Sequence, residues 1–393
     1  MKRGEAPAYR ICARCVMDTS DVHISFEANG YCNHCREYQM KTGQELPDCT
    51  IAAHLLENLV REIKEAGRGK PYDCVIGLSG GVDSSYVALQ IKRLGLRPIA
   101  VHLDNGWNSE LAVHNIENTV RKLKIDLITK VLDWPEFSDL QRSFFYASVP
   151  NCEAPTDHAI VASLFQCAAK FRVRHIISGS NLTTEGMHLP PEWGHDSKDW
   201  QNIQDIHRKH GKLPMKSFPH LTFAAFCWRL FVNRIRFTPL LNYMAYHKQE
   251  AIDTIQQELG WKNYGPKHGE SIFTRFYQEY YLPKKFGFDK RRLHLSTLIL
   301  SGQVSRADAL TQLALPLLSA DELREYKALF LKKLKFTPED WEQILQAEPR
   351  AHTAYRHNCM LSQRNSALYR LGRRIATSRR DLGLAKKRHE PKG

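Results

Sequence analysis

Apolar residues recur at helix or strand spacing through the first half of the chain and divide it into alternating elements. Residues 51–66 carry apolar side chains every three or four positions, which predicts a helix. From residue 70 to residue 182, short apolar runs then alternate with helical patterns. The predicted strands are residues 72–78, 98–103, 126–132 and 175–178, and the predicted helices between them are residues 82–94, 109–123 and 156–171.

This alternation is typical of an α/β fold in which helices cover both faces of a parallel, doubly wound sheet. Ligands of such sheets bind beyond the carboxyl ends of the strands. The predicted strands end near Ser79, Asp104 and Gly179. We therefore expect the functional site to gather around these three positions.

The second half of the chain has a weaker pattern. Residues 186–300 are rich in aromatic side chains and show no clear period, so they are predicted to be irregular. After Ser301 the pattern becomes helical. Ser319-Ala-Asp-Glu322 and Thr337-Pro-Glu-Asp340 each predict a helix start with a capping box.

Composition narrows the class of protein. The chain has 393 residues, of which 42% are apolar and 25% charged, as in globular proteins. It lacks the run of about 18 apolar residues that a membrane span needs, and residues 1–5 lack the apolar core of a signal peptide. A cytoplasmic location is therefore expected.

The formal charge is +14 and is unevenly distributed. Residues 364–392 carry ten Lys or Arg against two acids, a balance of +8. Such a charge suits nucleic acid, a nucleotide-linked substrate or an anionic membrane face. The alternative is a solvated, partly disordered tail.

A candidate phosphate loop follows the first predicted strand directly and precedes a predicted helix. Adjacent glycines allow close approach of an anion, which backbone N–H groups and the positive helix end then face. Serine hydroxyls add donors, and Asp83 suits such a site if Mg²⁺ lies between it and the phosphates. The alternative is a glycine-rich turn capped by serines. The loop lacks the Walker Gly-Lys-Ser/Thr ending and consists of Ser79, Gly80, Gly81, Val82, Asp83, Ser84 and Ser85.

Two cysteine pairs near the N-terminus predict a metal site. Cys12-x2-Cys15 and Cys32-x2-Cys35 are separated by sixteen residues. Four thiolates at this spacing favour a structural, tetrahedral Zn²⁺ ion. Because the region has few apolar residues, zinc binding would supply the free energy that folds it. An iron–sulfur cluster and free thiols are the alternatives.

The loop resembles the signature of the ATP-pyrophosphatase superfamily, a HUP-like group that includes the asparagine, GMP, NAD and argininosuccinate synthetases and tRNA-thiolating enzymes. This resemblance implies that ATP transfers AMP to a carbonyl oxygen and leaves pyrophosphate in the loop. Residues 179–185 are similar to a segment of NAD synthetase, which implies that Glu185 holds Mg²⁺ with Asp83. Asp104 and Asn105 lie where relatives hold adenosine, although they could equally cap a turn.

The chain encodes no recognisable source of nitrogen or sulfur for such a reaction. Residue 2 is lysine, so there is no N-terminal cysteine nucleophile, and no cysteine lies in a Gly-x-Cys-x-Gly elbow. Ammonia would therefore come from a partner. No Cys-x-x-Cys pair follows the loop either, which disfavours sulfur transfer.

A third motif indicates which class of substrate would accept the AMP. Together with Cys-x2-Cys-Val-Met-Asp-Thr-Ser-Asp at 12–21 and the loop, residues 264–292 resemble the N-acetyl sugar amidotransferases of lipopolysaccharide (O-antigen) and other surface-polysaccharide biosynthesis. The resemblance spans about residues 10–310. It departs from the family at one position, because Gly265-Pro266-Lys267-His268 stands where members usually have Gly-Gly-Lys-His.

This resemblance implies that an acetamido group on a nucleotide-linked sugar becomes an acetamidino group. The implied partners are a HisH-like glutaminase and a HisF-like subunit that channels ammonia, and no nucleic acid is expected. Lys267 and Arg275 are candidates to neutralise phosphate charge, and His268 could manage a proton of ammonia; a basic, solvated face is the alternative for all three. The basic tail would dock the partners or touch the inner membrane face.

The predicted organisation is a four-cysteine zinc module (1–48), an ATP-pyrophosphatase domain with a substrate-side insertion (49–240), a helical C-terminal domain (241–350) and a basic tail (351–393). Two other functions stay open. A tRNA-modifying, thiolating enzyme would suit the charge, and a non-catalytic assembly factor could keep the fold as a scaffold.

Overall fold

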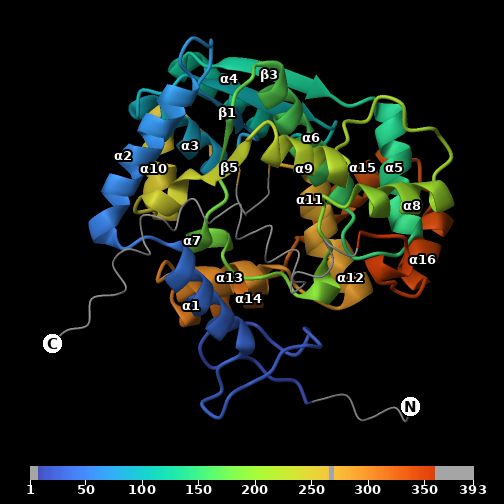
Figure 1. Cartoon of the computed structure of the whole chain (residues 1–393). Helices are drawn as coiled ribbons and strands as arrows, with labels where there is room; N and C mark the ends of the chain where they lie inside the picture. The colour runs from blue at the N-terminus through green and yellow to red at the C-terminus, as the bar shows by residue number, and fades with distance from the viewer. Residues whose placement is uncertain (1–7, 265–269, 359–393) are drawn as a thin grey trace.

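The computed structural model describes residues 8–264 and 270–358, and a parallel sheet lies at its centre (Figure 1). Its five strands lie in the order β3-β2-β1-β4-β5, and every neighbouring pair is parallel. The predicted α/β fold with a parallel sheet is therefore confirmed. The strands are β1 (Cys74–Gly77), β2 (Pro98–Asp104), β3 (Asp126–Val131), β4 (His175–Ser178) and β5 (Arg236–Pro239).

Helices cover both faces of the sheet because successive residues of its central strands point to opposite sides. Ile76 and Ala100 pack into one core with residues of α3 (Val82–Arg93), α4 (Glu110–Leu123) and α10 (Lys248–Leu259). Val75 and Ile99 pack into a second core with α6 (Ala154–Lys170). Burial on both faces explains why these strands are continuous apolar runs.

The prediction that residues 186–300 are irregular is wrong. Besides β5 and α10, this region holds several short helices. These helices have 5–11 residues, so each shows at most about three turns of a 3.6-residue period. They are α8 (Trp200–His210), α9 (Phe223–Phe231), α11 (Ile272–Phe276), α12 (Leu282–Phe286) and α13 (Arg291–Leu300).

The C-terminal helices follow the predicted pattern. Both predicted capping boxes are confirmed: Ser319 and Glu322 cap α15 (Ala320–Leu334), and Thr337 and Asp340 cap α16 (Pro338–Gln346). No helix in the described part of the chain is both long and apolar enough to cross a membrane. The remaining helices are α1 (Asn33–Glu45), α2 (Cys49–Ala66), α5 (Trp134–Tyr146), α7 (Leu182–Glu185) and α14 (Arg306–Ala314).

An aromatic cluster joins the sheet domain to the C-terminal helices, which lie beside α5 in Figure 1. Phe145 of α5 is fully buried and contacts five aromatic rings of the C-terminal part at centroid distances of 4.9–6.0 Å. Ring pairs at this spacing stabilise beyond their buried area. The partners are Phe273, Tyr281, Phe330, Phe336 and Trp341.

We expect Phe145→Ala to lower the free energy of unfolding by about 3–5 kcal/mol, because it opens a cavity between the two parts. Chemical denaturation measures this change. Val131→Ala is the matched control: Val131 is 63% exposed, so its truncation should change stability by less than about 0.5 kcal/mol. Equal effects of the two substitutions would contradict this account of the aromatic cluster.

Candidate active site

The predicted phosphate loop joins β1 to α3 at the carboxyl edge of the sheet. Its serines hold one another: Ser79 Oγ accepts from the Gly81 N–H at 3.3 Å and lies 3.2 Å from Ser84 Oγ. Ser84 Oγ also donates to the Gly81 carbonyl at 3.1 Å. Helix α3 begins at Val82, so its positive end and its first free N–H groups lie in the loop.

Gly80 is required by the backbone here. Its φ is +81°, and a Cβ at this position would lie 2.5 Å from the carbonyl oxygen of Ala112 in α4. Its own carbonyl accepts from the Trp261 indole N–H at 2.8 Å and from the Asn115 amide at 3.4 Å. Asn115 is completely buried and also bonds the backbone of Lys262 through both its amide atoms. Trp261 and Asn115 thus fix the loop through the Gly80 carbonyl. No sequence motif indicated this role.

The two predicted magnesium ligands approach the same tyrosine. The Tyr246 hydroxyl donates to Asp83, and burial together with the charges of Asp83 and Glu185 raises the pKa of Tyr246. Gly179 lets the end of β4 lie close to Asp83, because a Cβ on residue 179 would be 3.1–3.2 Å from atoms of Asp83. Two carboxylates beside a phosphate loop are the oxygen ligands that Mg²⁺ prefers, so these residues fit the expected ion.

Tyr264 and Glu270 lie on the other side of the loop. Their oxygens would be 3.3 and 3.5 Å from a Cβ on Gly81. The Tyr264 hydroxyl accepts from the backbone of Val82 and donates to Glu270, and burial and the Glu270 charge raise the pKa of Tyr264. Lys267 and His268, the predicted catalytic residues between these two, lie outside the described residues, so their roles stay predictions.

Asp104 and Asn105 close the turn after β2. Asp104 Oδ1 accepts from the Gly106 N–H at 2.9 Å, and Asn105 Oδ1 accepts from the Trp107 N–H at 3.1 Å. Lys333 of α15 lies 4.5 and 4.9 Å from the Trp107 and Trp134 rings and donates to the Gly106 carbonyl. The geometry supports the turn-capping reading directly, and the adenosine role of both residues stays a prediction.

Arg275 is engaged by neighbouring helices. Its guanidinium donates to Glu322 at 2.7 Å and to the Tyr326 hydroxyl at 2.9 Å, and it pairs with Glu279 at 3.4 Å. These contacts tie α11 to α15. The structure therefore gives Arg275 a packing role, and the proposed neutralisation of phosphate by Arg275 gains no support from this geometry.

Other basic residues of the third motif also have internal partners. Arg292 pairs with Asp18 at 2.9 Å, Arg291 pairs with Asp289 at 2.8 Å, and Lys285 donates to the Ala347 carbonyl at 2.7 Å. Arg292 and Lys285 thereby join elements that are distant in sequence.

Two tryptophans of the region 186–300, Trp193 and Trp200, are buried, whereas a third, Trp228, is exposed.

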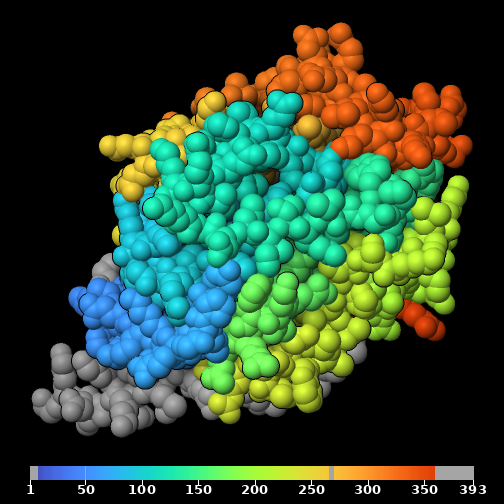
Figure 2. Space-filling view, turned by 90° about the horizontal axis from the view of Figure 1, so that it is seen from above, coloured from blue at the N-terminus to red at the C-terminus, as the bar shows by residue number. Residues whose placement is uncertain are grey.

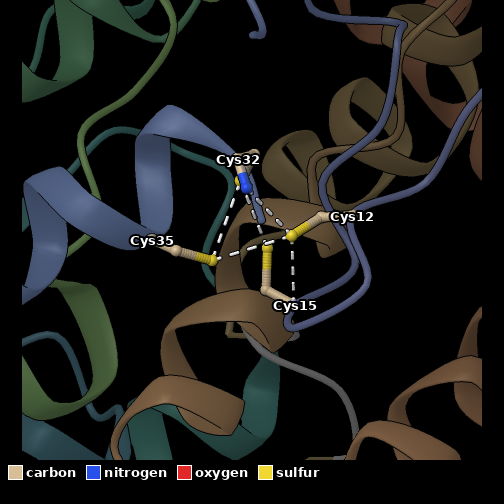
Figure 3. Close-up of side chains that lie close together, drawn as sticks. All are labelled: Cys12, Cys15, Cys32 and Cys35. Atoms are coloured by element: carbon tan, nitrogen blue, oxygen red, sulfur yellow. Dashed lines mark hydrogen bonds between the residues drawn. The ribbon is translucent and has the colours of Figure 1, made fainter. Parts of the chain in front are cut away.

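The four N-terminal cysteines converge (Figure 3). All are buried, and three Sγ–Sγ distances are 3.7 Å: Cys12–Cys35, Cys15–Cys32 and Cys32–Cys35. Tetrahedral zinc with bonds of about 2.3 Å places its sulfurs about 3.8 Å apart. In a multi-iron cluster the thiolates bind different irons and lie further apart. The geometry fits a single ion, and the buried, closed ligand set fits structural zinc.

The cysteine module supports the carboxylate site through α1. The Tyr38 hydroxyl donates to the Leu182 carbonyl at 3.2 Å, and Lys41 Nζ donates to the Gly186 carbonyl at 3.0 Å. These two carbonyls flank Glu185 in and beside α7. From the opposite side, Arg306 of α14 donates to the Cys12 and Cys15 carbonyls. A metal ion held by the four cysteines would therefore stabilise the segment that contains Glu185, a predicted magnesium ligand.

The C-terminal part joins the site through backbone pairing. The Ser109 N–H donates to the Glu270 carbonyl at 2.9 Å, and the Ile272 N–H donates to the Trp107 carbonyl at 3.1 Å. Residues 270–369 match the family described as "LPS biosynthesis protein WbpG-like, C-terminal domain". This segment is therefore similar to the C-terminal domain of WbpG-like proteins. The predicted kinship with lipopolysaccharide biosynthesis proteins is confirmed, and the WbpG-like domain contacts the turn after β2.

The other similar proteins either match a shorter part of the chain or resemble its fold only weakly. A glutamine-hydrolyzing GMP synthase of Thermus thermophilus is 36% identical over 76 residues, which are 19% of this chain and only 14% of that relative. NMN synthetase from Francisella tularensis has a TM-score of 0.35 at 14% identity, covering 73% of this chain and 97% of its own. The NH3-dependent NAD synthetase from Campylobacter jejuni has a TM-score of 0.28 at 17% identity, covering 53% and 93%.

We expect Gly80→Ala to weaken binding of magnesium pyrophosphate at least about tenfold, because the new Cβ meets the Ala112 carbonyl and the loop must move. Isothermal titration measures the affinity. Gly69→Ala is a matched control, since Gly69 has a similar φ of +74° but open space around its Cβ position. Gly69→Ala should cost about 1 kcal/mol of stability and leave the affinity unchanged. Unaltered affinity in Gly80→Ala would contradict the assignment of the loop.

We expect one zinc ion per chain, and its loss in Cys15→Ser, because the remaining three thiolates no longer enclose the ion. Elemental analysis by mass spectrometry measures the metal. Cys227→Ser, a change outside the cluster, should keep it. Purified protein that contained iron and absorbed visible light instead would overturn the zinc assignment.

Proposed function

We propose that this chain is an ATP-dependent amidotransferase that converts a sugar acetamido group into an acetamidino group. The observation that carries the proposal is the junction at the carboxyl edge of the sheet. There Tyr246 donates to Asp83 of the Ser79–Ser85 loop, and burial and the charge of Glu185 raise the pKa of Tyr246. Glu270, the first residue of the WbpG-like match, lies beside Gly81 of the same loop. We infer that an ATP-activating loop and a domain similar to that of a lipopolysaccharide biosynthesis family form one site.

The chemistry follows from the weakness of an amide as an electrophile. In the first step the amide oxygen attacks the α-phosphorus of ATP, and the bond to pyrophosphate breaks. The oxygen, now bonded to AMP, becomes a good leaving group. In the second step ammonia forms a bond to the carbon and loses a proton. The carbon–oxygen bond then breaks, and AMP departs with the amide oxygen.

The chain's own groups have separate tasks in this scheme. The N–H groups of the loop and the hydroxyls of Ser79 and Ser84 hold the pyrophosphate, whose charge increases as it leaves. Mg²⁺ held by Asp83 and Glu185 would neutralise phosphate charge. His268 remains the candidate to accept the ammonia proton, and Lys267 the candidate to stabilise the departing AMP.

As the substrate we propose the nucleotide-linked sugars of surface-polysaccharide synthesis. The description of the WbpG-like family, which names lipopolysaccharide biosynthesis, supports this class of pathway. Ammonia would come from a HisH-like glutaminase through a HisF-like subunit. The matched GMP synthase, whose name records glutamine hydrolysis, supports nitrogen as the nucleophile. Docking of these partners on the basic tail is part of the proposal, and residues 359–393 of that tail lie outside the described residues.

The thiolating alternative has a weaker basis in the cysteines. Sulfur transfer needs a reactive, partly exposed thiolate. Burial raises the pKa of every cysteine outside the cluster whose side chain is described, to about 11 for Cys167 and in the same direction for Cys74, Cys152 and Cys227. These thiols stay protonated at neutral pH, which favours ammonia over sulfur as the nucleophile.

The decisive experiment labels the oxygen. Purified protein is incubated with ATP, ammonium and a nucleotide-linked di-N-acetylated sugar whose acetyl oxygens are ¹⁸O. We expect pyrophosphate, AMP that carries one ¹⁸O, and a sugar product in which NH replaces the oxygen. Release of ADP and phosphate, or release of pyrophosphate only when tRNA is added, would contradict the proposal.

We expect Asp83→Asn to lower the turnover number about a hundredfold or more, since the neutral amide is a poor ligand for Mg²⁺. Steady-state pyrophosphate release measures the rate. The melting temperature and zinc content should stay those of the parent protein. Normal turnover in this variant would show that the assigned metal role is wrong, and the same measurement separates an enzyme from a non-catalytic scaffold.

A further inference from the structure

A long stretch of the chain is free of acidic residues. Residues 206–249 contain neither Asp nor Glu. They contain eight Lys or Arg residues, at positions 208, 209, 212, 216, 229, 234, 236 and 248. The surface of a globular protein normally mixes both signs of charge. Arg208 and Lys209 pair with Asp205, and Arg236 pairs with Glu62, both acids outside the stretch. The stretch still has an excess of positive charge, which suits an anionic partner.

Helix α9 lies within this stretch and exposes apolar side chains. Its sequence is Phe-Ala-Ala-Phe-Cys-Trp-Arg-Leu-Phe, and none of its nine residues is buried. Trp228, Phe231 and the following Val232 are 60%, 49% and 54% exposed. Aromatic and aliphatic side chains grouped in this way are uncommon on a free surface and mark a contact with another apolar phase.

Basic residues surround the end of this helix. Arg234 follows α9, and Arg172 and Arg174 lie on the neighbouring segment before β4; all three are exposed. The segments adjoin, since the Arg236 N–H donates to the Arg174 carbonyl. Figure 2 shows the green and yellow-green segments side by side on one face. We call Trp228, Phe231 and Val232 with these three arginines and Arg229 the α9 patch.

The α9 patch lies at the amino end of the sheet. Strands β4 and β5 begin at His175 and Arg236, directly after the arginines of the patch. The candidate active site lies at the carboxyl ends of the strands. A partner bound to the patch therefore leaves the site open, but a subunit seated there would have no short path for delivering ammonia.

We propose that the α9 patch docks the protein on an anionic lipid bilayer. Tryptophan and phenylalanine enter the interfacial layer of a membrane, and the arginines around them contact lipid phosphates. A second copy of the chain fits poorly, because a symmetric contact would place two basic surfaces together. Glu62, an acidic group beside the start of β5, already pairs with Arg236 and does not offset the arginines of the patch.

Flotation with lipid vesicles tests this proposal. We expect the full chain to bind vesicles of phosphatidylcholine with about 30–40% phosphatidylglycerol and to bind pure phosphatidylcholine far less, with about a tenfold difference or more. The double variant Trp228→Ala/Phe231→Ala should lose about tenfold in affinity for the anionic vesicles. Arg229→Gln and Arg234→Gln should each lose about fivefold.

Matched controls separate the patch from general effects. Val131→Ala and Arg324→Gln remove an exposed apolar and an exposed basic side chain elsewhere, and both should bind like the parent protein. Melting temperatures report whether each variant is folded. Membrane binding that survives in the patch variants but is lost in a chain ending at Gly372 would overturn the proposal in favour of the basic tail. Loss of glutaminase association instead of vesicle binding would overturn it in favour of a protein partner.

Discussion

The carbonyl of Gly80 fixes the position of the whole phosphate loop. It accepts from Trp261 and Asn115, while the α4 backbone closes the space into which a side chain would project. A buried carbonyl must find such donors, because an unpaired one costs about 1–3 kcal/mol. Since Asn115 also holds the backbone of Lys262, the same contact sets the start of the segment that carries Lys267 and His268. The same buried side chain, Asn115, therefore fixes both the conformation of the loop and the position at which the third motif begins.

The C-terminal helices stabilise the site from the other side. Phe145 and its aromatic partners seat these helices on α5, and Lys333 and the residues after Glu270 hold the turn that follows β2. The cysteine module adds the third support by holding α7, which ends in Glu185, through the carbonyls of Leu182 and Gly186. The loop and its carboxylates thus depend on side chains from several distant parts of the chain, which keeps the site ordered before any ligand arrives.

Local signals predicted the sheet, the loop and the cysteine cluster well, because a buried strand, a glycine pair and a Cys-x2-Cys knuckle each occupy adjacent residues. Long-range partners could not be read in the same way. Arg275 has the positive charge expected of a residue that binds phosphate. The residues around it in the sequence do not indicate that its partner is Glu322. Asn115 belongs to an ordinary helical pattern, and only the fold brings it to Gly80. The helices of 186–300 were missed because each has at most about three turns, too few for a 3.6-residue period to be recognised.

The electrostatics of the site couple its ligands to one another. Burial raises the pKa of Tyr246 and of Tyr264, and nearby carboxylates raise them further: Asp83 and Glu185 for Tyr246, Glu270 and Asp83 for Tyr264. Several acidic groups therefore lie near the loop. A nucleotide without a cation would add to this repulsion, whereas magnesium bound to the phosphates relieves it. For the proposed ATP and Mg²⁺ ligands, each would raise the affinity for the other by the same factor, because the coupling free energy is reciprocal. If the proposed function holds, the acidic surroundings of the loop would make it selective for the magnesium complex of the nucleotide.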